Sequence, residues 1–415
     1  MYKKAISCTL CLFVFVFFLS GWLFSTENNL QSSLVYLTWQ KDPTTTMTVQ
    51  WLARVGTESD DVFYQQEGTK KWSVLPGKHF SIPQNTLYSV HRVELTGLSP
   101  DTSYIFRVGA FDRLYKFRTM PKILDKPIRF VVGGDMYHDD IKLLDETNQQ
   151  AASSNPLFAL LGGDIAYASS RHANRKNKNE AKRWLQWIIS WNKHMVTPDG
   201  HMIPFIPAIG NHDVNGFFDQ PKENAPYFYT LFAFPGPQGY NVLDFGDYLS
   251  LLVLDTGHTN RIAGAQTLWL QQTMEKKENV MHKFALYHVP AYPSVRKMNT
   301  ANSLNVRENW VPIFERYKLS AGFENHEHAY KRTHPILKNQ ATAQGVLYFG
   351  DGAWGVDNPR MPKKTKDSWY LAKALQERHF ILVTIDGMNR NFKAIKPNGE
   401  VLDTYEQVRP KSALP

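Results

Sequence analysis

Cysteine is almost absent from this sequence of 415 residues: it contains two, Cys8 and Cys11, and both stand near its start. No disulfide can therefore cross-link the rest of the chain, whose folding does not depend on oxidation. The absence of thiolates also disfavours a structural zinc cage, which is commonly built on cysteine.

The sequence also lacks internal repeats, low-complexity linkers and any recognised nucleic-acid-binding module. Its formal net charge of +9 and its pI near 9.2 would otherwise suggest nucleic acid or an acidic surface as a partner. The densest basic segments, 171–183 and 360–366, are most simply interpreted as solvated loops. A weaker alternative is that they raise the local concentration of a phosphorylated substrate.

The N-terminal segment has the layout of a secretory signal. The basic start "MYKK" precedes the run "AISCTLCLFVFVFFLSGWLF", which carries no charge and is about long enough to span a bilayer. The cleavage pattern that follows is poor, so residues 1–30 are predicted to be either a signal peptide or an uncleaved anchor. The chain is expected to be exported, whether secreted, periplasmic or tethered to a membrane.

Residues 31–121 are predicted to form an all-β sandwich like an immunoglobulin or fibronectin III domain. Short strands with alternating apolar residues occur in "TMTVQWLA" and "SYIFRVGA". Between them, Leu98, Pro100, Thr102 and Tyr104 have the spacing of a tyrosine corner. This domain is interpreted as a spacer or docking module.

Residues 126–410 are predicted to form an α/β (α+β) domain. Apolar runs that end in Gly and polar loops alternate with helical patterns, which indicates a parallel or mixed sheet covered on its faces. The residues of the strongest helical stripe are interpreted as core: Trp184, Trp187, Ile188, Trp191 and Met195. The tail from His379 is expected to form antiparallel strands, the last two joined through "KPNGE".

Oxygen and imidazole donors follow successive predicted strands. They are Asp135, Asp164, Asn211 with His212, His288, and His326 with His328. Any one of them is ordinary on its own, but their ordered recurrence at strand ends, mostly beside glycine, favours a shared site. Such donors suit Zn, Mn or Fe, and their number fits two ions bridged by one carboxylate.

Four motifs resemble those of the calcineurin-like metallophosphoesterases, and of the purple acid phosphatases in particular. They are "GGDIAY" at 162–167, "GNHD" at 210–213, "FALYH" at 284–288 and "NHEHAYKR" at 325–332. The resemblance extends to the N-terminal sandwich that these enzymes often carry. It implies a four-layer β-sandwich flanked by helices for the second domain.

Carried over residue by residue, the resemblance implies a centre of Fe(III) and a divalent ion (Zn, Mn or Fe). Asp135, Tyr167 and His328 would hold the first ion, and Asn211, His288 and His326 the second. Asp164 would bridge the two. His212 would protonate the leaving oxygen or stabilise the charge that develops on the phosphoryl group.

The chain departs from the family pattern at several positions. Tyr137 replaces a glycine, and its ring is expected either to crowd the first ion or to compete with Tyr167. Asn325 replaces another glycine, and Ala285 a valine. The histidines that plant-type members use to hold substrate phosphate after the fourth motif are absent, so Arg296 or Lys297 is considered as a replacement; a solvated loop is the simpler reading.

These features predict hydrolysis of phosphate monoesters by hydroxide that two cations generate from bound water. A phosphodiesterase or nucleotide hydrolase on the same metals is one alternative. A non-catalytic exported binding protein is another, although the complete set of expected ligand types argues against it. The partner expected is a small phosphorylated molecule; the sequence leaves the oligomeric state open.

Overall fold

The computed structural model describes residues 33–56, 59–83, 87–169, 180–363 and 368–408. The predicted signal or anchor segment lies outside these ranges. Within them, no helix has the length and apolar character needed to cross a membrane.

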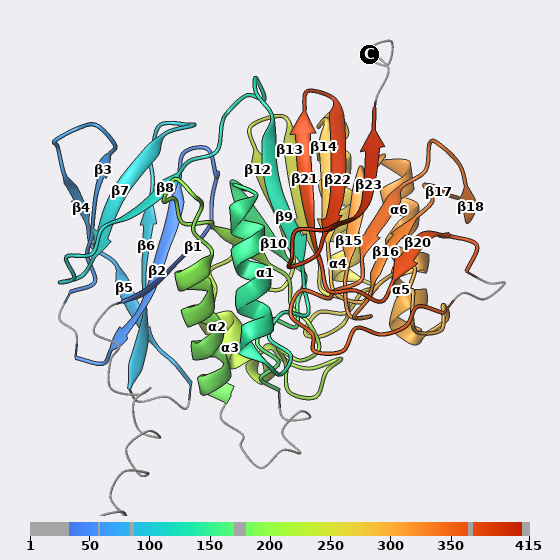
Figure 1. Ribbon diagram of the computed structural model, residues 1–415, viewed down its shortest axis with the longest axis horizontal. Helices are drawn as coiled ribbons and strands as arrows, with labels where there is room; N and C mark the ends of the chain where they lie inside the picture. Colours follow the sequence, from blue (N-terminus) through green and yellow to red (C-terminus); the bar gives the residue numbers. More distant parts are fainter. Residues whose placement is uncertain (1–32, 57–58, 84–86, 170–179, 364–367, 409–415) are drawn as a thin grey trace, which may run out of the picture.

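The N-terminal part is a sandwich of two four-stranded antiparallel sheets (Figure 1). One sheet has the order β1 (Leu34–Thr38), β2 (Met47–Arg54), β6 (Tyr88–Leu95) and β5 (Lys78–Ser81). The other has the order β4 (Ser73–Leu75), β3 (Val62–Gln66), β7 (Ser103–Val108) and β8 (Tyr115–Arg118). The Ser99 N–H donates to the Tyr104 hydroxyl over 2.8 Å, so the predicted tyrosine corner is present.

The second part contains two large mixed sheets. The six-stranded sheet has the order β11 (Phe205–Pro207), β10 (Phe158–Leu161), β9 (Ile128–Gly133), β21 (Phe380–Asp386), β22 (Asn389–Ile395) and β23 (Val401–Gln407). The seven-stranded sheet has the order β12 (Asn241–Phe245), β13 (Leu249–Val253), β14 (His282–Leu286), β15 (Ala321–Glu324), β19 (Leu347–Gly350), β16 (Tyr330–Thr333) and β20 (Leu371–Leu375). A two-stranded hairpin, β17 (Ile336–Leu337) and β18 (Gln340–Ala341), stands apart from both.

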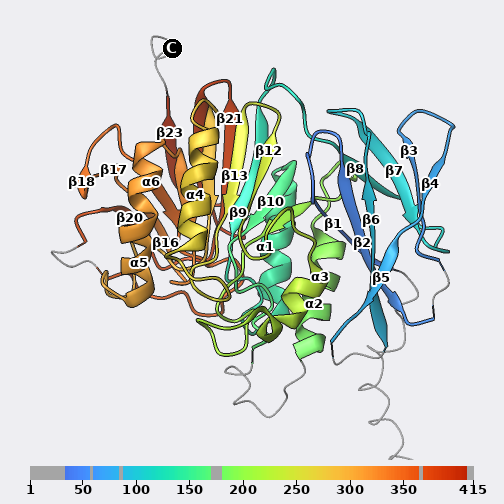
Figure 2. The same cartoon turned by 180° about the vertical axis from the view of Figure 1, so that it is seen from behind.

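Helices cover the outer faces of both sheets, which gives four layers (Figures 1 and 2). Helices α1 (Ile141–Ser153) and α2 (Glu180–His194) lie on the six-stranded sheet, and α4 (Ala265–Lys276), α5 (Ala301–Asn309) and α6 (Val311–Arg316) on the seven-stranded sheet. The short helix α3 (Pro226–Leu231) follows a 3-10 turn at Lys222–Asn224. The predicted fold class is therefore confirmed, including the sandwich in front of it.

Aromatic residues fill the space between the two large sheets. Phe130 on β9 meets Phe284 on β14 at a centroid distance of 5.7 Å, and Phe349 on β19 stacks on Phe392 of β22 at 4.4 Å. The predicted tryptophan stripe packs in a separate outer core, where Trp187 and Ile188 are fully buried. Both cores hold the strands, and therefore the strand ends, in fixed positions.

The parallel strands bring their carboxyl ends to one edge of the molecule. Strand β10 pairs in parallel with β9 and β11, and β14 pairs in parallel with β13 and β15. The loops that follow these strands gather at the lower edge in Figure 1. Ligands of sheets with such parallel strands bind at this edge, so the candidate site is sought there.

Candidate metal centre

All seven expected metal ligands lie together on loops after five strands. Asp135 follows β9, Asp164 and Tyr167 follow β10, Asn211 follows β11, His288 follows β14, and His326 with His328 follows β15. Five of them have left-handed backbone conformations: Asp135 (φ 56°), Asp164 (51°), Tyr167 (48°), His326 (78°) and His328 (60°). This conformation is unfavourable for side chains with a Cβ, and its concentration here is typical of a functional site.

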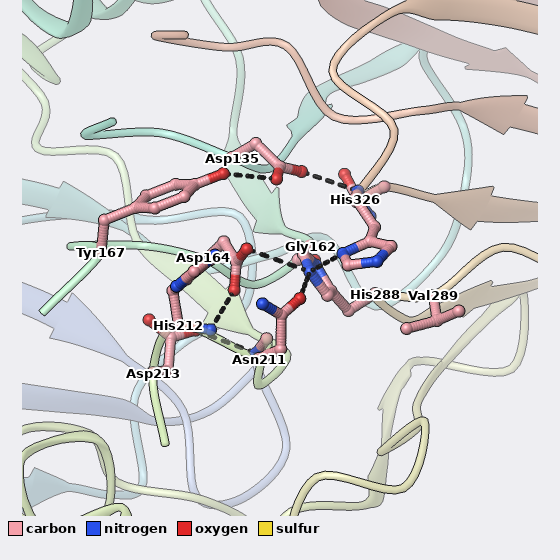
Figure 3. A network of polar contacts seen from close by, with 12 residues as sticks. Asp135, Gly162, Asp164, Tyr167, Asn211, His212, Asp213, His288, Val289 and His326 are labelled. Carbon is pink, nitrogen blue, oxygen red and sulfur yellow. Dashed lines mark hydrogen bonds and ion pairs between the residues drawn. The ribbon is translucent and has the colours of Figure 1, made fainter. Parts of the chain in front are cut away.

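Asp135, Tyr167 and His328 form one group of converging atoms. The Tyr167 hydroxyl lies 2.7 Å from Asp135 Oδ1 and 2.7 Å from His328 Nε2, and those two atoms are 2.9 Å apart. The hydroxyl donates to Asp135 Oδ1, and it accepts from His328 Nε2 when that nitrogen carries a proton. The His326 N–H donates to the other oxygen, Asp135 Oδ2, over 2.8 Å and fixes the carboxylate (Figure 3).

The second group converges on one nitrogen of His288. Its Nε2 lies 3.0 Å from Asn211 Oδ1, 3.1 Å from His326 Nδ1 and 3.2 Å from Asp164 Oδ2. Its Nδ1 lies 2.9 Å from the Gly162 carbonyl, to which it can only donate. Once the proton on Nε2 is lost, the lone pair of this nitrogen faces an amide oxygen, a carboxylate oxygen and an imidazole nitrogen, an arrangement that a cation would satisfy.

Asp164 lies between the two groups (Figure 3). Its Oδ1 accepts from the His212 N–H over 2.6 Å. Its Oδ2 is buried and receives no hydrogen bond from the described part of the chain. Its nearest partner is His288 Nε2 at 3.2 Å, an ion pair while that imidazole is protonated, and a cation that displaced the proton would take the same place between the two groups.

The distances within both groups fit metal coordination. Ligands at right angles around an ion, each about 2.1 Å from it, lie about 3 Å from one another. The contacts among the seven side chains span 2.7–3.2 Å. Carboxylates, imidazoles, a phenol and an amide oxygen are also donors that Fe, Zn and Mn accept. The residues present therefore fit a pair of such ions.

The protonation states of His288 and Tyr167 in the absence of metal agree with a site for cations. Burial alone would lower the pKa of His288, but the Asp164 carboxylate raises it to about 9. Burial and the neighbouring Asp135 carboxylate raise the pKa of Tyr167 well above its usual value. Without a cation the site therefore keeps a proton on His288 and on the phenol, and a bound cation would displace both.

Asn325 occupies the place of the family glycine without entering the centre. Its Nδ2 donates to the Tyr287 carbonyl over 2.9 Å. A Cβ on Gly162 would lie 1.9 Å from that nitrogen, and one on Gly134 would lie 2.6 Å from Asn325 Oδ1. Asn325 therefore ties the loops after β9, β10 and β14 together, and the two glycines make room for it.

The expectation that Tyr137 crowds the first ion or competes with Tyr167 is wrong. Its hydroxyl donates to Gln186 Oε1 on α2 over 2.9 Å, and the Arg183 guanidinium lies 4.2 Å from its ring centroid. The ring is buried against helix α2, while the loop after β9 is hydrogen-bonded to the loop after β10. The Tyr137 N–H, for example, donates to the Ile165 carbonyl over 3.1 Å.

His212 is half-buried at the edge of the centre. Its ring stacks on Tyr167 at a centroid distance of 4.7 Å, and its Nδ1 lies 3.3 Å from Ser169 Oγ. The loop is held by Asp213, whose carboxylate accepts from the Ile165 and Gly210 N–H groups over 2.9 Å each. Its position beside Asn211 in the "GNHD" motif suggested a role for His212 but none for Asp213.

Arg296 and Lys297, the two basic residues considered for phosphate binding, have different surroundings. The Arg296 guanidinium donates to Glu327 Oε1 over 2.7 Å and to the His326 carbonyl over 2.9 Å, which places it beside a ligand loop. Lys297 is exposed. Arg360 also reaches the His326 carbonyl, over 3.3 Å. The interpretation of 360–366 as a solvated loop is therefore wrong for its first residue, which only the tertiary fold brings to the centre.

Two further histidines lie against the centre. The His138 ring meets the Tyr167 ring edge-on at a centroid distance of 4.8 Å and the His328 ring at 5.4 Å. His258 is buried and lies 5.6 Å from His288 between ring centroids. His258 follows β13 in "DTGHTN", and its place after an apolar strand is the sequence feature that indicates it.

Comparison with known families agrees with this arrangement. Residues 33–119 match the family model described as the purple acid phosphatase N-terminal domain, and residues 128–330 match the calcineurin-like phosphoesterase model. The chain belongs to the calcineurin-like phosphoesterases of the purple acid phosphatase type. Within the second match lie all seven expected metal ligands, which span Asp135 to His328.

Several curated relatives of this phosphoesterase are similar over much of its length. An uncharacterized protein of Mycobacterium tuberculosis is 26% identical, with 61% of this chain and 52% of the relative covered. Purple acid phosphatase 13 of Arabidopsis thaliana is 24% identical, with 64% and 54% covered. Acid phosphatase type 7 of Mus musculus is 22% identical, with 95% and 98% covered. The chain thus spans about half the length of the first two relatives.

Solved structures show the same fold. The purple acid phosphatase PPD1 from yellow lupin seeds superimposes with a TM-score of 0.73 at 17% identity, and 90% of this chain and 73% of the lupin chain are covered. The structure of PhoD gives a TM-score of 0.64 at 12% identity, with 88% of each chain covered.

Proposed function

We propose that this phosphoesterase hydrolyses phosphate monoesters at a binuclear metal centre. The observation that carries the proposal is the convergence of two donor groups on either side of Asp164, whose buried Oδ2 lies 3.2 Å from His288 Nε2. The first ion would be held by Asp135, Tyr167 and His328, and the second by Asn211, His288 and His326. Asp164 would contact both.

Iron(III) is proposed for the first position because Tyr167 is a phenol. The pKa of that phenol is raised by burial, so only a strongly charged cation would make it ionise. The second position, with two imidazoles and an amide oxygen, suits Zn, Mn or Fe in the divalent state. Such a pair, when bound, draws charge from phosphoryl oxygens and lowers the pKa of water.

His212 is proposed as the acid that protonates the leaving oxygen. As water attacks phosphorus and the bond to the ester oxygen breaks, that oxygen takes up a negative charge, which a proton from an imidazole removes. His212 stacks on Tyr167 and is half-buried, so it can reach a substrate above the centre. The neighbouring Asn211 occupies the donor position, and this leaves His212 directed toward the substrate.

Arg296 and Arg360 are proposed to hold the non-transferred oxygens of the phosphate. Both donate to the His326 carbonyl and are partly exposed, so the two guanidinium groups lie beside the same ligand loop. Guanidinium groups bind phosphate through paired hydrogen bonds, and they would supply the contact that histidines provide in plant-type enzymes. Lys297 stays a weaker proposal, because it is exposed on the adjacent loop.

A panel of substrates tests the monoesterase proposal. Turnover of alkyl and aryl phosphate monoesters is compared with turnover of the matched diesters, in wild type and in Asp164→Asn. Monoester turnover that exceeds diester turnover and is lost in Asp164→Asn is expected. Faster diester turnover would replace the proposal with a phosphodiesterase, and no turnover by metal-loaded wild type would favour a binding protein.

We also propose that the chain is exported through its basic and apolar N-terminal segment, either secreted, periplasmic or tethered. Fractionation of cells that express the full chain tests this. Recovery outside the cytosol or in the membrane fraction is expected, and recovery entirely in the cytosol would contradict it.

A further inference from the structure

A second group of metal-binding side chains lies in the N-terminal sandwich, outside the catalytic domain. It consists of Asp60, His79 and His91, whose donor atoms all lie within 4.8 Å of one another. We propose that these three residues form a separate site for one divalent cation of the zinc type.

The sheet places the two histidines side by side on one face. His79 on β5 and His91 on β6 stand directly opposite each other in an antiparallel pair, so their side chains leave the same face. Their rings lie 5.4 Å apart between centroids. The adjacent cross-strand pair is Lys78 and Arg92. Because neighbouring residues of a strand point to opposite faces, these two positively charged side chains leave the other face of the sheet, away from the site.

Asp60 comes from the loop before β3 and places its carboxylate between the two rings. His79 Nδ1 lies 2.9 Å from Asp60 Oδ2, and His91 Nδ1 lies 2.5 Å from Asp60 Oδ1. The loop approaches β5 closely because residue 77 is glycine: a Cβ there would lie 2.8 Å from the Asp60 carbonyl oxygen. Both imidazoles therefore present the same nitrogen to one carboxylate.

Second contacts fix the orientation of the inner ring. His91 Nε2 lies 2.9 Å from Ser89 Oγ, and the ring stacks on Trp51 with a centroid distance of 5.0 Å and an angle of 18°. With Nδ1 bound to a cation, Nε2 carries the proton and donates it to Ser89. A partner on the other nitrogen is typical of histidines that bind metals.

The site is closed on its inner side and open on its outer side. The side chain of His91 is 2% exposed, that of Asp60 27% and that of His79 60%. Two imidazoles and a carboxylate leave one position of a tetrahedron for water, and this donor set favours zinc over calcium or magnesium. The cation would tie the exposed edge strand β5 to the loop before β3 in a domain that has no cysteine to cross-link them.

The test counts zinc ions in the full chain after equilibrium dialysis against buffered zinc. Wild type is compared with His79→Asn and Asp60→Asn, and with Lys78→Ser as the matched control on the opposite face of β5. His79 is exposed, so its replacement should leave the fold intact, as circular dichroism would verify. We expect one zinc ion fewer per chain in both site variants than in wild type and Lys78→Ser, with turnover of nitrophenyl phosphate unchanged.

The count distinguishes this site from the catalytic centre. If the catalytic centre binds no metal, wild type still exceeds His79→Asn by one ion. Equal zinc content in wild type and His79→Asn would overturn the proposal. If Asp60→Asn failed to fold, the comparison of wild type with His79→Asn would still decide, because the His79 side chain is exposed and its replacement removes one donor of the same site.

Discussion

At the scale of single residues, the direction of each ring decides its role in the centre. Tyr137 and Tyr167 stand on adjacent loops, but Tyr137 faces α2 whereas Tyr167 contacts Asp135 and His328. His212 stacks on Tyr167 and leaves the donor position to its neighbour Asn211. Two predictions depend on these directions.

The first concerns His212. His212→Ala should keep both metal ions and lose about a hundred-fold or more in turnover of an alkyl phosphate, the usual effect of losing a general acid. Nitrophenyl phosphate should suffer less, since its leaving group needs little protonation. Steady-state rates on both esters and metal analysis check this. Loss of metal together with an equal loss on both esters would assign His212 to the ligands.

The second concerns colour. If Tyr167 binds ferric iron, the oxidised protein absorbs visible light through phenolate-to-iron charge transfer. Tyr167→Phe should remove this band, whereas Tyr137→Phe, whose hydroxyl contacts Gln186, should keep it. Spectra of the three iron-loaded proteins check the assignment. Loss of colour in Tyr137→Phe alone would transfer the role, and a colourless iron-bound wild type would exclude a ferric phenolate.

The sequence predicts residue types better than side-chain directions. That these seven side chains lie together could be expected from the sequence, because they follow successive apolar strands in motifs of a known order. The direction of Tyr137 and the approach of Arg360 could not, because they depend on contacts with Gln186 and with the loop of His326, which are distant in sequence. The position of the Asn325 side chain could not be predicted either, because it depends on the space that Gly134 and Gly162 leave at two other strand ends.

At the scale of elements, a buried charge network supports the strand that carries the histidine pair. Lys331 on β16 is fully buried, contacts Glu324 at the end of β15, and lies 3.0 Å from Asp351 Oδ1 after β19. The Asp351 carbonyl accepts from the N–H groups of Glu327 and His328. The network therefore connects three strands to the loop of the metal ligands.

Lys331→Met should destabilise the protein by about 3–5 kcal/mol, because it leaves two buried carboxylates without their cation. The matched control is Lys373→Met, which removes a partly exposed partner 3.5 Å from Asp403 and should cost about 1 kcal/mol or less. Urea unfolding of both variants measures the difference. Equal and small losses would mean that the buried carboxylates become protonated at little cost.

A buried histidine before β21 should make stability depend on pH. Burial lowers the pKa of His379 to about 4, from an ordinary value of 6.5. Between these values the unfolded chain binds a proton that the folded chain does not, so the free energy of unfolding decreases as pH falls, by up to about 3 kcal/mol. His379→Phe, which keeps a ring against Tyr330, should lose this part of the dependence.

Urea unfolding at pH 7 and pH 5, in the presence of a chelator, measures this effect. The chelator keeps metal release out of the comparison. The decrease in the free energy of unfolding on acidification should be smaller in His379→Phe than in wild type. An unchanged decrease would show that other groups cause the acid sensitivity.

At the scale of the whole molecule, the sandwich and the catalytic domain share a core. The Tyr36 hydroxyl donates to the Leu231 carbonyl over 2.6 Å, and Asn192 Nδ2 donates to the Val35 carbonyl over 2.8 Å. Trp39 meets Phe158 of the six-stranded sheet edge-on at 6.2 Å. The sequence predicts only a spacer or docking module, because these contacts join segments too distant in sequence for periodicity to reveal.

The proposed function requires that a pair of metal ions held around Asp164 carries out monoester hydrolysis. Its most direct test is a metal titration of stripped protein, followed through turnover of nitrophenyl phosphate. The His79→Asn variant is used so that the sandwich site does not contribute to the count. We expect no turnover without metal and full turnover at two bound ions per chain. Turnover by stripped protein, or two bound ions without turnover, would contradict it.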